Sequence, residues 1–210
     1  RSPRCAGRLD EVGRIGPGKG THIAADLVKR IGGRLIVAGP GHIDPAPHIE
    51  AVGVVGPEQR RELLSRAKGV ICASMYVEPF CGVQVEAMLS GTPVISTDWG
   101  AFTEVNLHGI TGYRCRTMEQ FEWAARNIDR IDPRACREWA ERNYSLERVA
   151  LMYDEYFHGV ASIQSGAGWY ELNPDRQNLD WLARYVPTSL PPRGAATSAG
   201  GNWPTSAANR

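Results

Sequence analysis

The sequence lacks most of the features that mark a membrane, secreted or metal-binding protein. Its 210 residues include only five cysteines and five histidines, and no two of them stand at the spacing of a metal site. No apolar run approaches the roughly 20 residues of a membrane-spanning helix, and the first residues contain no apolar segment typical of a signal peptide. We therefore expect a cytoplasmic protein with reduced thiols and no bound metal.

An excess of charge of either sign is also absent. Lys and Arg number 24 and Asp and Glu number 23, so the formal net charge is +1. This balance gives no electrostatic basis for binding nucleic acid or an anionic membrane, and we expect neither partner. The hydrophobic fraction of 42% is sufficient for the core of one ordinary domain with an appendage.

Short apolar runs alternate with helical patterns along most of the chain. The runs are continuous and rich in β-branched residues, which is typical of strands covered on both faces. They lie at 34–39, 52–55, 69–73, 93–97 and 112–115, and the helical patterns lie at 20–31, 57–67, 82–89, 117–128, 133–144 and 145–157. This alternation predicts an α/β fold, a Rossmann-like doubly wound parallel sheet, in which ligands bind at the carboxyl ends of the strands.

The two ends of the chain differ from this middle part. The segment before Gly13 is polar, so we expect residues 1–12 to form a poorly defined segment. The main domain is predicted at 13–160, followed by an extension at 161–186 with a candidate helix around Trp181. Residues 187–210 are mostly Pro, Gly, Ser, Thr, Ala and Asn, which predicts a disordered tail.

The strongest chemical signal is a pair of acids around a helix start. Glu78 precedes the predicted helix and Glu86 lies about one turn inside it, with Gly82 between them. Free amides at a helix start favour anions or hydroxyl oxygens, and glycine allows a ligand close to the backbone. Two such carboxylates can accept hydrogen bonds from two groups of sugar hydroxyls. Taken alone, they fit equally well as solvated acids favoured by the helix dipole.

Two further loops carry weaker signals. Gly13 to Gly20 is a glycine-rich loop with the fixed cations Arg14 and Lys19, a combination that can hold a diphosphate, although basic turns are common. Its spacing matches neither the Walker A pattern nor Gly-x-Gly-x-x-Gly. A strand and a glycine-containing loop occupy Gly91 to Glu104, where the alternative is an ordinary turn capped by Asp98.

Together and in this order, these segments resemble the carboxyl-terminal, donor-binding domain of the GT-B retaining glycosyltransferases, in the large group often called family 4. The resemblance covers about residues 13–157. Four elements carry it: a Gly-Arg-x4-Lys-Gly loop at Gly13–Gly20, a Glu-x7-Glu element at Glu78–Glu86, a Gly-Thr-Pro-Val turn at Gly91–Gly100, and a Gly-x-Thr-Gly turn at Gly109–Gly112.

The resemblance implies a role for each candidate residue. Arg14 and Lys19 would bind the diphosphate of a nucleotide-sugar donor and stabilise the leaving group, so neither a metal nor another cofactor would be needed. Glu78 would contact the donor sugar near the reacting carbon, and Glu86 would bind the ribose hydroxyls. The remaining donor-binding positions would be Gly16 in the loop, Val55 against the base, and the backbone at Phe80, Cys81, Gly82 and Val83.

Three departures from the family pattern limit this interpretation. Cys81 stands where the family usually has glycine, and its Cβ would crowd the backbone if φ is positive. The strand before Gly13 is polar, and the amino-terminal domain that holds the acceptor is absent from this sequence. We therefore expect the isolated chain to bind a donor weakly and to transfer little sugar.

Two other functions stay open. The chain could be a non-catalytic module that binds a nucleotide sugar or docks a partner with the same fold. It could also belong to a GT-B relative such as an epimerase or a phosphorylase. The Glu-x7-Glu element is unusual for an epimerase. A phosphorylase needs a cofactor lysine, and Lys29 and Lys68 both lie outside the candidate ligand loops.

Overall fold

The computed structural model of the chain describes residues 7–165 and contains one six-stranded sheet. The strand order is β3-β2-β1-β4-β5-β6, and every neighbouring pair is parallel. The strands are β1 (Arg8–Val12), β2 (Arg34–Ala38), β3 (Ile49–Gly53), β4 (Gly69–Cys72), β5 (Val94–Thr97) and β6 (Gly112–Cys115). The predicted doubly wound parallel sheet is therefore confirmed.

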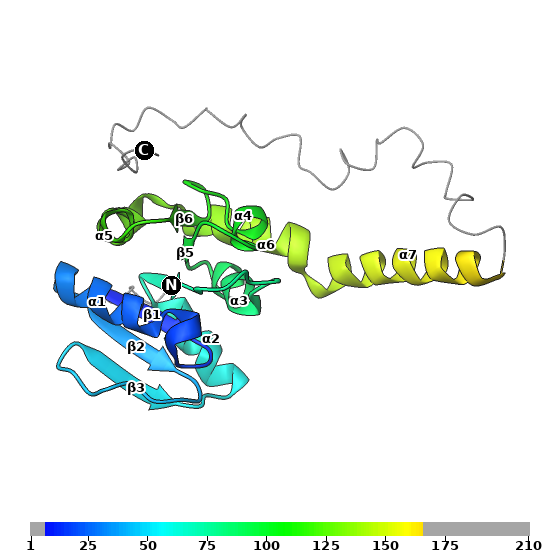
Figure 1. Cartoon of the computed structure of the whole chain (residues 1–210). Coiled ribbons are helices and arrows are strands. Elements are labelled where there is room, and N and C mark those ends of the chain that lie inside the picture. The colour runs from blue at the N-terminus through cyan, green and yellow to red at the C-terminus, as the bar shows by residue number, and fades with distance from the viewer. Residues whose placement is uncertain (1–6, 166–210) are drawn as a thin grey trace, which may run out of the picture. The chain divides into compact units, whose positions relative to one another are not determined.

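Helices connect the strands and cover the sheet (Figure 1). The helix α1 packs with α5 on one face, and α2 packs with α3 on the other. The helices are α1 (Thr21–Ile31), α2 (Pro57–Arg66), α3 (Gly82–Leu89), α4 (Phe102–Val105), α5 (Met118–Asn127), α6 (Pro133–Tyr144) and α7 (Leu146–Ser165), with short 3-10 turns η1 (Pro17–Lys19) and η2 (Ile128–Arg130). Thr117 and Ser145 accept amide hydrogen bonds at the starts of α5 and α7, so both residues cap these helices.

The sequence interpretation of the first strand was wrong, because β1 is one of the two central strands of the sheet rather than part of a poorly defined segment. Its polar side chains are buried with partners. Asp10 accepts two hydrogen bonds of 2.8 Å from Arg8, and Glu11 accepts one of 2.7 Å from Thr21. Local pairing of this kind allows polar residues to occupy a buried strand.

The third strand begins and ends earlier than its sequence suggests. The apolar run predicts a strand at 52–55, but β3 spans Ile49–Gly53. Gly53 has a φ of 72° that ends the strand, and Val54 after it is 76% exposed. As an edge strand β3 is largely exposed, whereas β4 and β5 are buried throughout.

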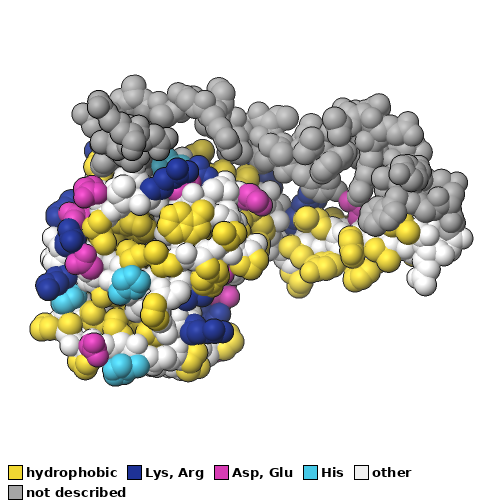
Figure 2. All heavy atoms as spheres, viewed as in Figure 1, with side chains coloured by type: hydrophobic (Ala, Val, Ile, Leu, Met, Phe, Trp, Pro, Cys, Tyr) yellow, Lys and Arg dark blue, Asp and Glu magenta, His cyan; other side chains and the backbone are white. Residues whose placement is uncertain are grey.

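The described residues divide into two compact units, and the division falls between Ala140 and Glu141. The main unit therefore ends before residue 160, where the predicted domain ends. The second unit contains α7, which carries exposed apolar side chains and a stacked pair formed by Tyr153 and Phe157. Figure 2 shows these apolar side chains as a yellow run along the helix.

The remaining predictions concern the end of the chain. The helix α7 continues to Ser165, which covers the start of the predicted extension. The candidate helix around Trp181 and the predicted tail at 187–210 lie outside the described residues. Within residues 7–165, no helix combines the length and the apolar character needed to cross a membrane.

Candidate functional site

The candidate site lies where the strand order reverses. The chain crosses from β1 to β2 on one side of the sheet, and from β4 to β5 on the other. In a sheet of this kind the loops at the carboxyl ends of the two central strands separate and leave a crevice for ligands. These loops are residues 13–20 after β1 and 73–81 after β4.

The two loops interlock through their backbones. Gly20 has a φ of 75°, and a Cβ atom there would overlap the carbonyl group of Ala73. The amide of Met75 donates a 2.8 Å hydrogen bond to the carbonyl of Gly18. Only glycine fits this approach at position 20, because any side chain would push the two loops apart.

Lys19 and Glu78 form an ion pair across this crevice. Lys19 Nζ lies 2.8 Å from Glu78 Oε2, and the same oxygen accepts a 2.7 Å hydrogen bond from the hydroxyl of Ser74. The Glu78 side chain is 8% exposed and that of Lys19 31%. The ammonium group also lies over the ring of Tyr76, 5.0 Å from its centroid. The structure thus brings together two predicted site residues that are 59 positions apart in the sequence.

The ion pair keeps Glu78 ionised and Lys19 protonated. Burial alone would raise the pKa of Glu78, but hydrogen bonds from Lys19, Ser74 and Tyr76 hold the pKa below its usual value. Burial would lower the pKa of Lys19, but the bond to Glu78 raises it. At neutral pH Glu78 is therefore an acceptor, and its second oxygen, Oε1, is not used by Lys19 or Ser74.

The loop after β5 fixes the backbone of Glu78. Gly100 has a φ of 59°, and a Cβ atom there would lie 2.7 Å from the Glu78 amide nitrogen and carbonyl oxygen. The amide of Ala101 donates to the Glu78 carbonyl at 2.9 Å. Trp99 Nε1 reaches back to the carbonyls of Ser74 and Tyr76. Three loops therefore hold this carboxylate in place.

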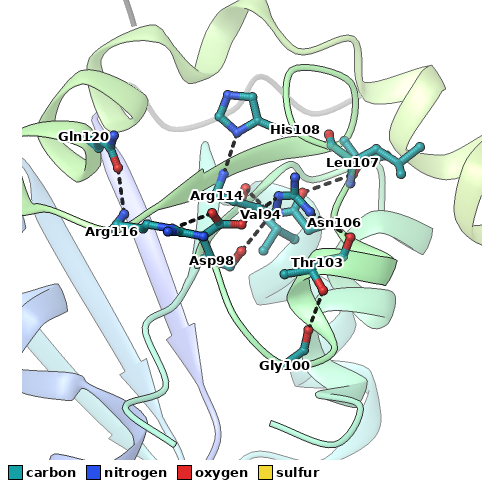
Figure 3. A network of polar contacts seen from close by, with 12 residues as sticks. Val94, Asp98, Gly100, Thr103, Asn106, Leu107, His108, Arg114, Arg116 and Gln120 are labelled. Carbon is teal, nitrogen blue, oxygen red and sulfur yellow. Dashed lines mark hydrogen bonds and ion pairs between the residues drawn. The ribbon is translucent and has the colours of Figure 1, made fainter. Parts of the chain in front are cut away.

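A polar network supports the same loop from the side of β6 (Figure 3). Asp98 pairs with Arg116 at 2.8 Å and with Arg114 at 3.3 Å, so it is not the helix cap that the sequence allows. The Thr103 hydroxyl donates to the Gly100 carbonyl at 2.9 Å. These contacts tie the turn at Gly100 to the end of the sheet.

The start of α3 contains a strained cysteine. Cys81 has a φ of 61° and is the single non-glycine residue with a positive φ in the described part of the chain. The thiol of Cys72 at the end of β4 and the amide of Gln84 lower the pKa of Cys81. Phe80 and Gly82 are exposed, and Val83 is partly exposed. The positive φ on which the expected crowding at position 81 depends is thus present in the structure.

Glu86 does not join the Lys19–Glu78 pair and instead contacts α2. Both of its carboxylate oxygens lie 3.0 Å from Arg60 Nη1. The two side chains line a pocket of about 710 Å³. The other residues that line it are Pro57, Arg61, Leu64, Ser65, Leu89, Ser90 and Arg137. Val55 is partly exposed two positions before Pro57, at the entrance to α2.

The remaining predicted residues differ in their environment. Arg14 is exposed, and its guanidinium has no ion pair or hydrogen bond within residues 7–165. The amide of Gly16 donates a 3.1 Å hydrogen bond to the hydroxyl of Thr21. Across the described residues, no cluster of three or more His, Cys, Asp or Glu side chains could hold a metal ion.

Sequence reasoning missed several residues that shape the site. Ser74 and Tyr76 contact Glu78 and Lys19, and Arg60 contacts Glu86. Ser74 and Tyr76 could have been selected from their place directly after a predicted strand, where ligand loops of α/β sheets lie. Arg60 gave no such signal, because it belongs to a helix whose charged residues are ordinary surface residues in sequence.

Comparison with known families decides what kind of domain this is. Residues 9–131 match the family described as "Glycosyl transferases group 1". The chain belongs to this family. The match includes the glycine-rich loop, the Lys19–Glu78 pair and Glu86, so the predicted resemblance is confirmed at the level of the family and of the GT-B type of fold.

Several relatives of this group 1 domain are known. A D-inositol 3-phosphate glycosyltransferase of Nocardia farcinica is 34% identical over 135 residues, which are 54% of this chain and 30% of that protein. The crystal structure of AviGT4, a glycosyltransferase involved in avilamycin A biosynthesis, superposes with a TM-score of 0.66 at 26% identity, covering 76% of this chain and 53% of that one. Anabaena Alr3699/HepE in complex with UDP and glucose has the same fold, with a TM-score of 0.64 at 18% identity over 72% of this chain and 48% of that one. The group 1 domain thus spans about half or less of the proteins it matches.

Proposed function

We propose that this chain is the donor-binding domain of a glycosyltransferase that moves a sugar from a nucleotide diphosphate sugar to an acceptor, with retention of the anomeric configuration. The observation that carries the proposal is the Lys19–Glu78 pair at the switch point of a group 1 domain. It places a fixed cation beside a fixed acceptor, and a diphosphate sugar needs both. A UDP and glucose complex of Anabaena HepE, which has the same fold, supports the choice of donor class.

In this proposal the cations act on the phosphates. Lys19 and the exposed Arg14 bind the diphosphate and stabilise the negative charge that develops on the leaving group. The Lys19 ammonium has three donors, so it can keep its bond to Glu78 while it binds a phosphate oxygen. Two cations supply the charge stabilisation that a metal ion supplies elsewhere, so the proposed reaction needs no metal and no cofactor.

The acidic residues act on hydroxyl groups. Glu78 Oε1 accepts from the donor sugar, because Oε2 is already bound by Lys19 and Ser74. The exposed backbone from Phe80 to Val83 lines the sugar and the phosphates. Each charge-assisted hydrogen bond of this kind contributes about 1.5–3 kcal/mol to binding.

The pocket beside Glu86 receives the nucleoside. Glu86 accepts from the ribose hydroxyls, and Val55 lies against the base. Arg60 holds the Glu86 carboxylate from one side at 3.0 Å, which restricts its rotation before a ribose arrives. The pocket of about 710 Å³ is large enough for a nucleoside-sized ligand.

Transfer itself requires a second domain that holds the acceptor. The chain covers 53% of AviGT4, and in this proposal it supplies the donor-binding half of such an enzyme while a second domain completes the site. We propose that the complete enzyme acts in the cytoplasm, where nucleotide sugars are available. A radiolabelled-donor assay tests this: robust transfer by the isolated chain contradicts the requirement, and the anomer formed by the two-domain protein tests retention.

Donor binding is tested by calorimetric titration of the chain with UDP, GDP and ADP, and with the matching nucleosides. Lys19→Met should weaken diphosphate binding by about 10-fold or more, and should leave nucleoside binding unchanged because a nucleoside has no phosphate. Glu86→Ala should weaken both, because both ligands contain the ribose. The two variants therefore separate the two halves of the site.

Matched controls come from the same helices. Lys29 and Glu62 lie outside the site, on α1 and α2, and the variants Lys29→Met and Glu62→Ala should bind as the wild type does. Nucleotide binding that survives Lys19→Met and Glu86→Ala unchanged would remove both assignments. Absence of any nucleotide binding by the folded chain would remove the proposed function.

A further inference from the structure

A second carboxylate lies beneath the glycine-rich loop, and the proposed function does not use it. Glu11 is the fourth residue of the central strand β1, in register with Val37 on β2, and is 7% exposed. Its Oε1 accepts a 2.7 Å hydrogen bond from the hydroxyl of Thr21. Its Oε2 is buried and has no hydrogen-bond partner within residues 7–165. A buried carboxylate oxygen without a partner is costly as an anion and is a natural place for a proton.

Thr21 connects this carboxylate to the loop. The Thr21 hydroxyl gives its hydrogen to Glu11 and accepts a 3.1 Å hydrogen bond from the amide of Gly16. Glu11 therefore determines which way the hydroxyl points, and the hydroxyl holds the middle of the loop that carries Arg14 and Lys19. A proton on Oε2 would leave this chain of bonds intact, because Oε1 alone takes part in it.

The charged neighbour of Glu11 is the lysine of the proposed donor site. Lys19 from η1 favours the carboxylate form by its charge. Thr21 from α1 donates the hydrogen bond. Cys72 from β4 interacts electrostatically with the carboxyl, but its hydrogen bond with Cys81 and its burial raise the pKa of the thiol, so it stays neutral. Asp10, the adjacent acid on β1, is held by Arg8. Burial outweighs the opposing effects of Thr21 and Lys19 and raises the pKa of Glu11 to about 7.

We propose that Glu11 is a positioning residue for the glycine-rich loop and that it takes up a proton from solvent when a phosphate-bearing ligand binds Lys19. The ligand brings negative charge next to the ammonium that favours the carboxylate form, so the proton on Oε2 becomes more stable. No other bond forms or breaks. The identity of the ligand as a nucleoside diphosphate rests on the proposed function; the coupling between a bound anion and the proton does not.

The experiment is a calorimetric titration of the chain with UDP just above neutral pH, repeated in buffers that differ in protonation enthalpy. The dependence of the heat on the buffer gives the number of protons taken up. The wild type should take up about half a proton or more per ligand. Glu11→Gln should take up close to none, and Glu62→Gln, an exposed acid on α2, should match the wild type.

Thr21→Val separates positioning from titration. This variant loses the hydroxyl that holds Gly16, so it should bind UDP more weakly. The lost bond also favoured the carboxylate form of Glu11, so the uptake of the proton should persist but move to higher pH. Thr21→Ser keeps the hydroxyl and should restore the affinity. If the role of Glu11 were merely structural, Glu11→Gln would change the affinity for UDP without changing the uptake of protons.

The outcomes distinguish the inference from the proposed function. UDP binding without proton uptake, or with equal uptake in Glu11→Gln, overturns the inference and leaves the function standing. If no nucleotide binds, the function fails, and inorganic pyrophosphate becomes the probe for the loop. Pyrophosphate that fails to bind, or binds without uptake of a proton, then overturns the inference as well.

If Glu11→Gln does not fold, a carboxyl-carbon NMR titration of the wild type and Thr21→Ser replaces it. The titration should show one glutamate with a midpoint near neutrality that moves upward when pyrophosphate is added. The absence of such a glutamate refutes the assignment.

Discussion

Replacing Glu11 by Gln should remove a loss of stability that the wild-type chain undergoes as the pH rises toward neutrality. The Glu11 pKa is raised from its ordinary value of 4.5 to about 7 in the fold. Between these values the unfolded chain has released the proton while the folded chain keeps it, so the free energy of unfolding falls as the pH rises. At about 1.4 kcal/mol per pH unit, the loss reaches roughly 3 kcal/mol near pH 7 and stays constant above it.

The assay is urea unfolding of wild type and Glu11→Gln, followed by tryptophan fluorescence at several values between about pH 5 and pH 8. The difference in unfolding free energy should shift in favour of the variant by about 2.5 kcal/mol over this range and then level off. Asp10, whose pKa is also raised by burial, is present in both proteins and cancels in the difference. Glu62→Gln serves as a control with no such trend. A difference that does not change with pH would refute the reasoning, because it would place the Glu11 pKa at its ordinary value.

The remaining predictions concern backbone strain and buried hydrogen bonds, and urea unfolding measures all of them. Cys81→Gly should raise the free energy of unfolding by about 0.5–1 kcal/mol, because a left-handed conformation costs a residue with a Cβ roughly 1–2 kcal/mol, partly offset by the freedom of glycine in the unfolded chain. Cys81→Val should lower the free energy of unfolding. Equal stabilities of the wild type and these two variants would contradict the strain. Gly20→Ala should cost about 3 kcal/mol or more, because the methyl group overlaps the Ala73 carbonyl, whereas Gly32→Ala, with a similar φ of 67° but no atom within 4 Å, should cost only about 1–2 kcal/mol. Thr92→Val should cost about 1–3 kcal/mol, since its buried hydroxyl donates to the Leu64 carbonyl at 2.6 Å; a neutral substitution would show that the bond contributes nothing.

Much of the fold could be predicted because local patterns and the tertiary structure agree. The helix at 82–89 and the strand at 112–115 are observed with the predicted bounds. The helix begins at Gly82 and ends before Ser90 and Gly91, and the strand follows the turn at Gly109 directly, so local turn signals were sufficient to define them. The same consistency made the order of the site loops readable from the sequence.

The central strand could not be predicted, because its stability depends on contacts with distant residues. Asp10 and Glu11 argue against a buried strand when they are read alone. Arg8 pairs with the first from the same strand, but Thr21 reaches one oxygen of the second from the start of the next helix. A local pattern does not show that such a partner will be close in space.

The sequence predicted which residues belong to the candidate site, but it did not predict which of them contact one another. The sequence identified Lys19, Glu78 and Glu86, yet it gave no sign that Lys19 contacts Glu78 while Glu86 contacts Arg60. Which carboxylate faces which cation depends on the direction in which each helix and loop leaves the sheet. The roles assigned to these residues stay predictions that the binding experiments test.

The interlocked glycines have a consequence for anyone who wishes to redesign this domain. Gly20 and Gly100 allow three loops to touch through their backbones, so a mutant library that varies these positions would consist mostly of unfolded members. The side chains of Met75, Tyr76, Val77 and Phe80 are exposed on the same loops. Diversity placed at these positions would change the chemistry of the crevice while its frame is kept. Selection for a new ligand should therefore vary these exposed positions and hold the two glycines constant.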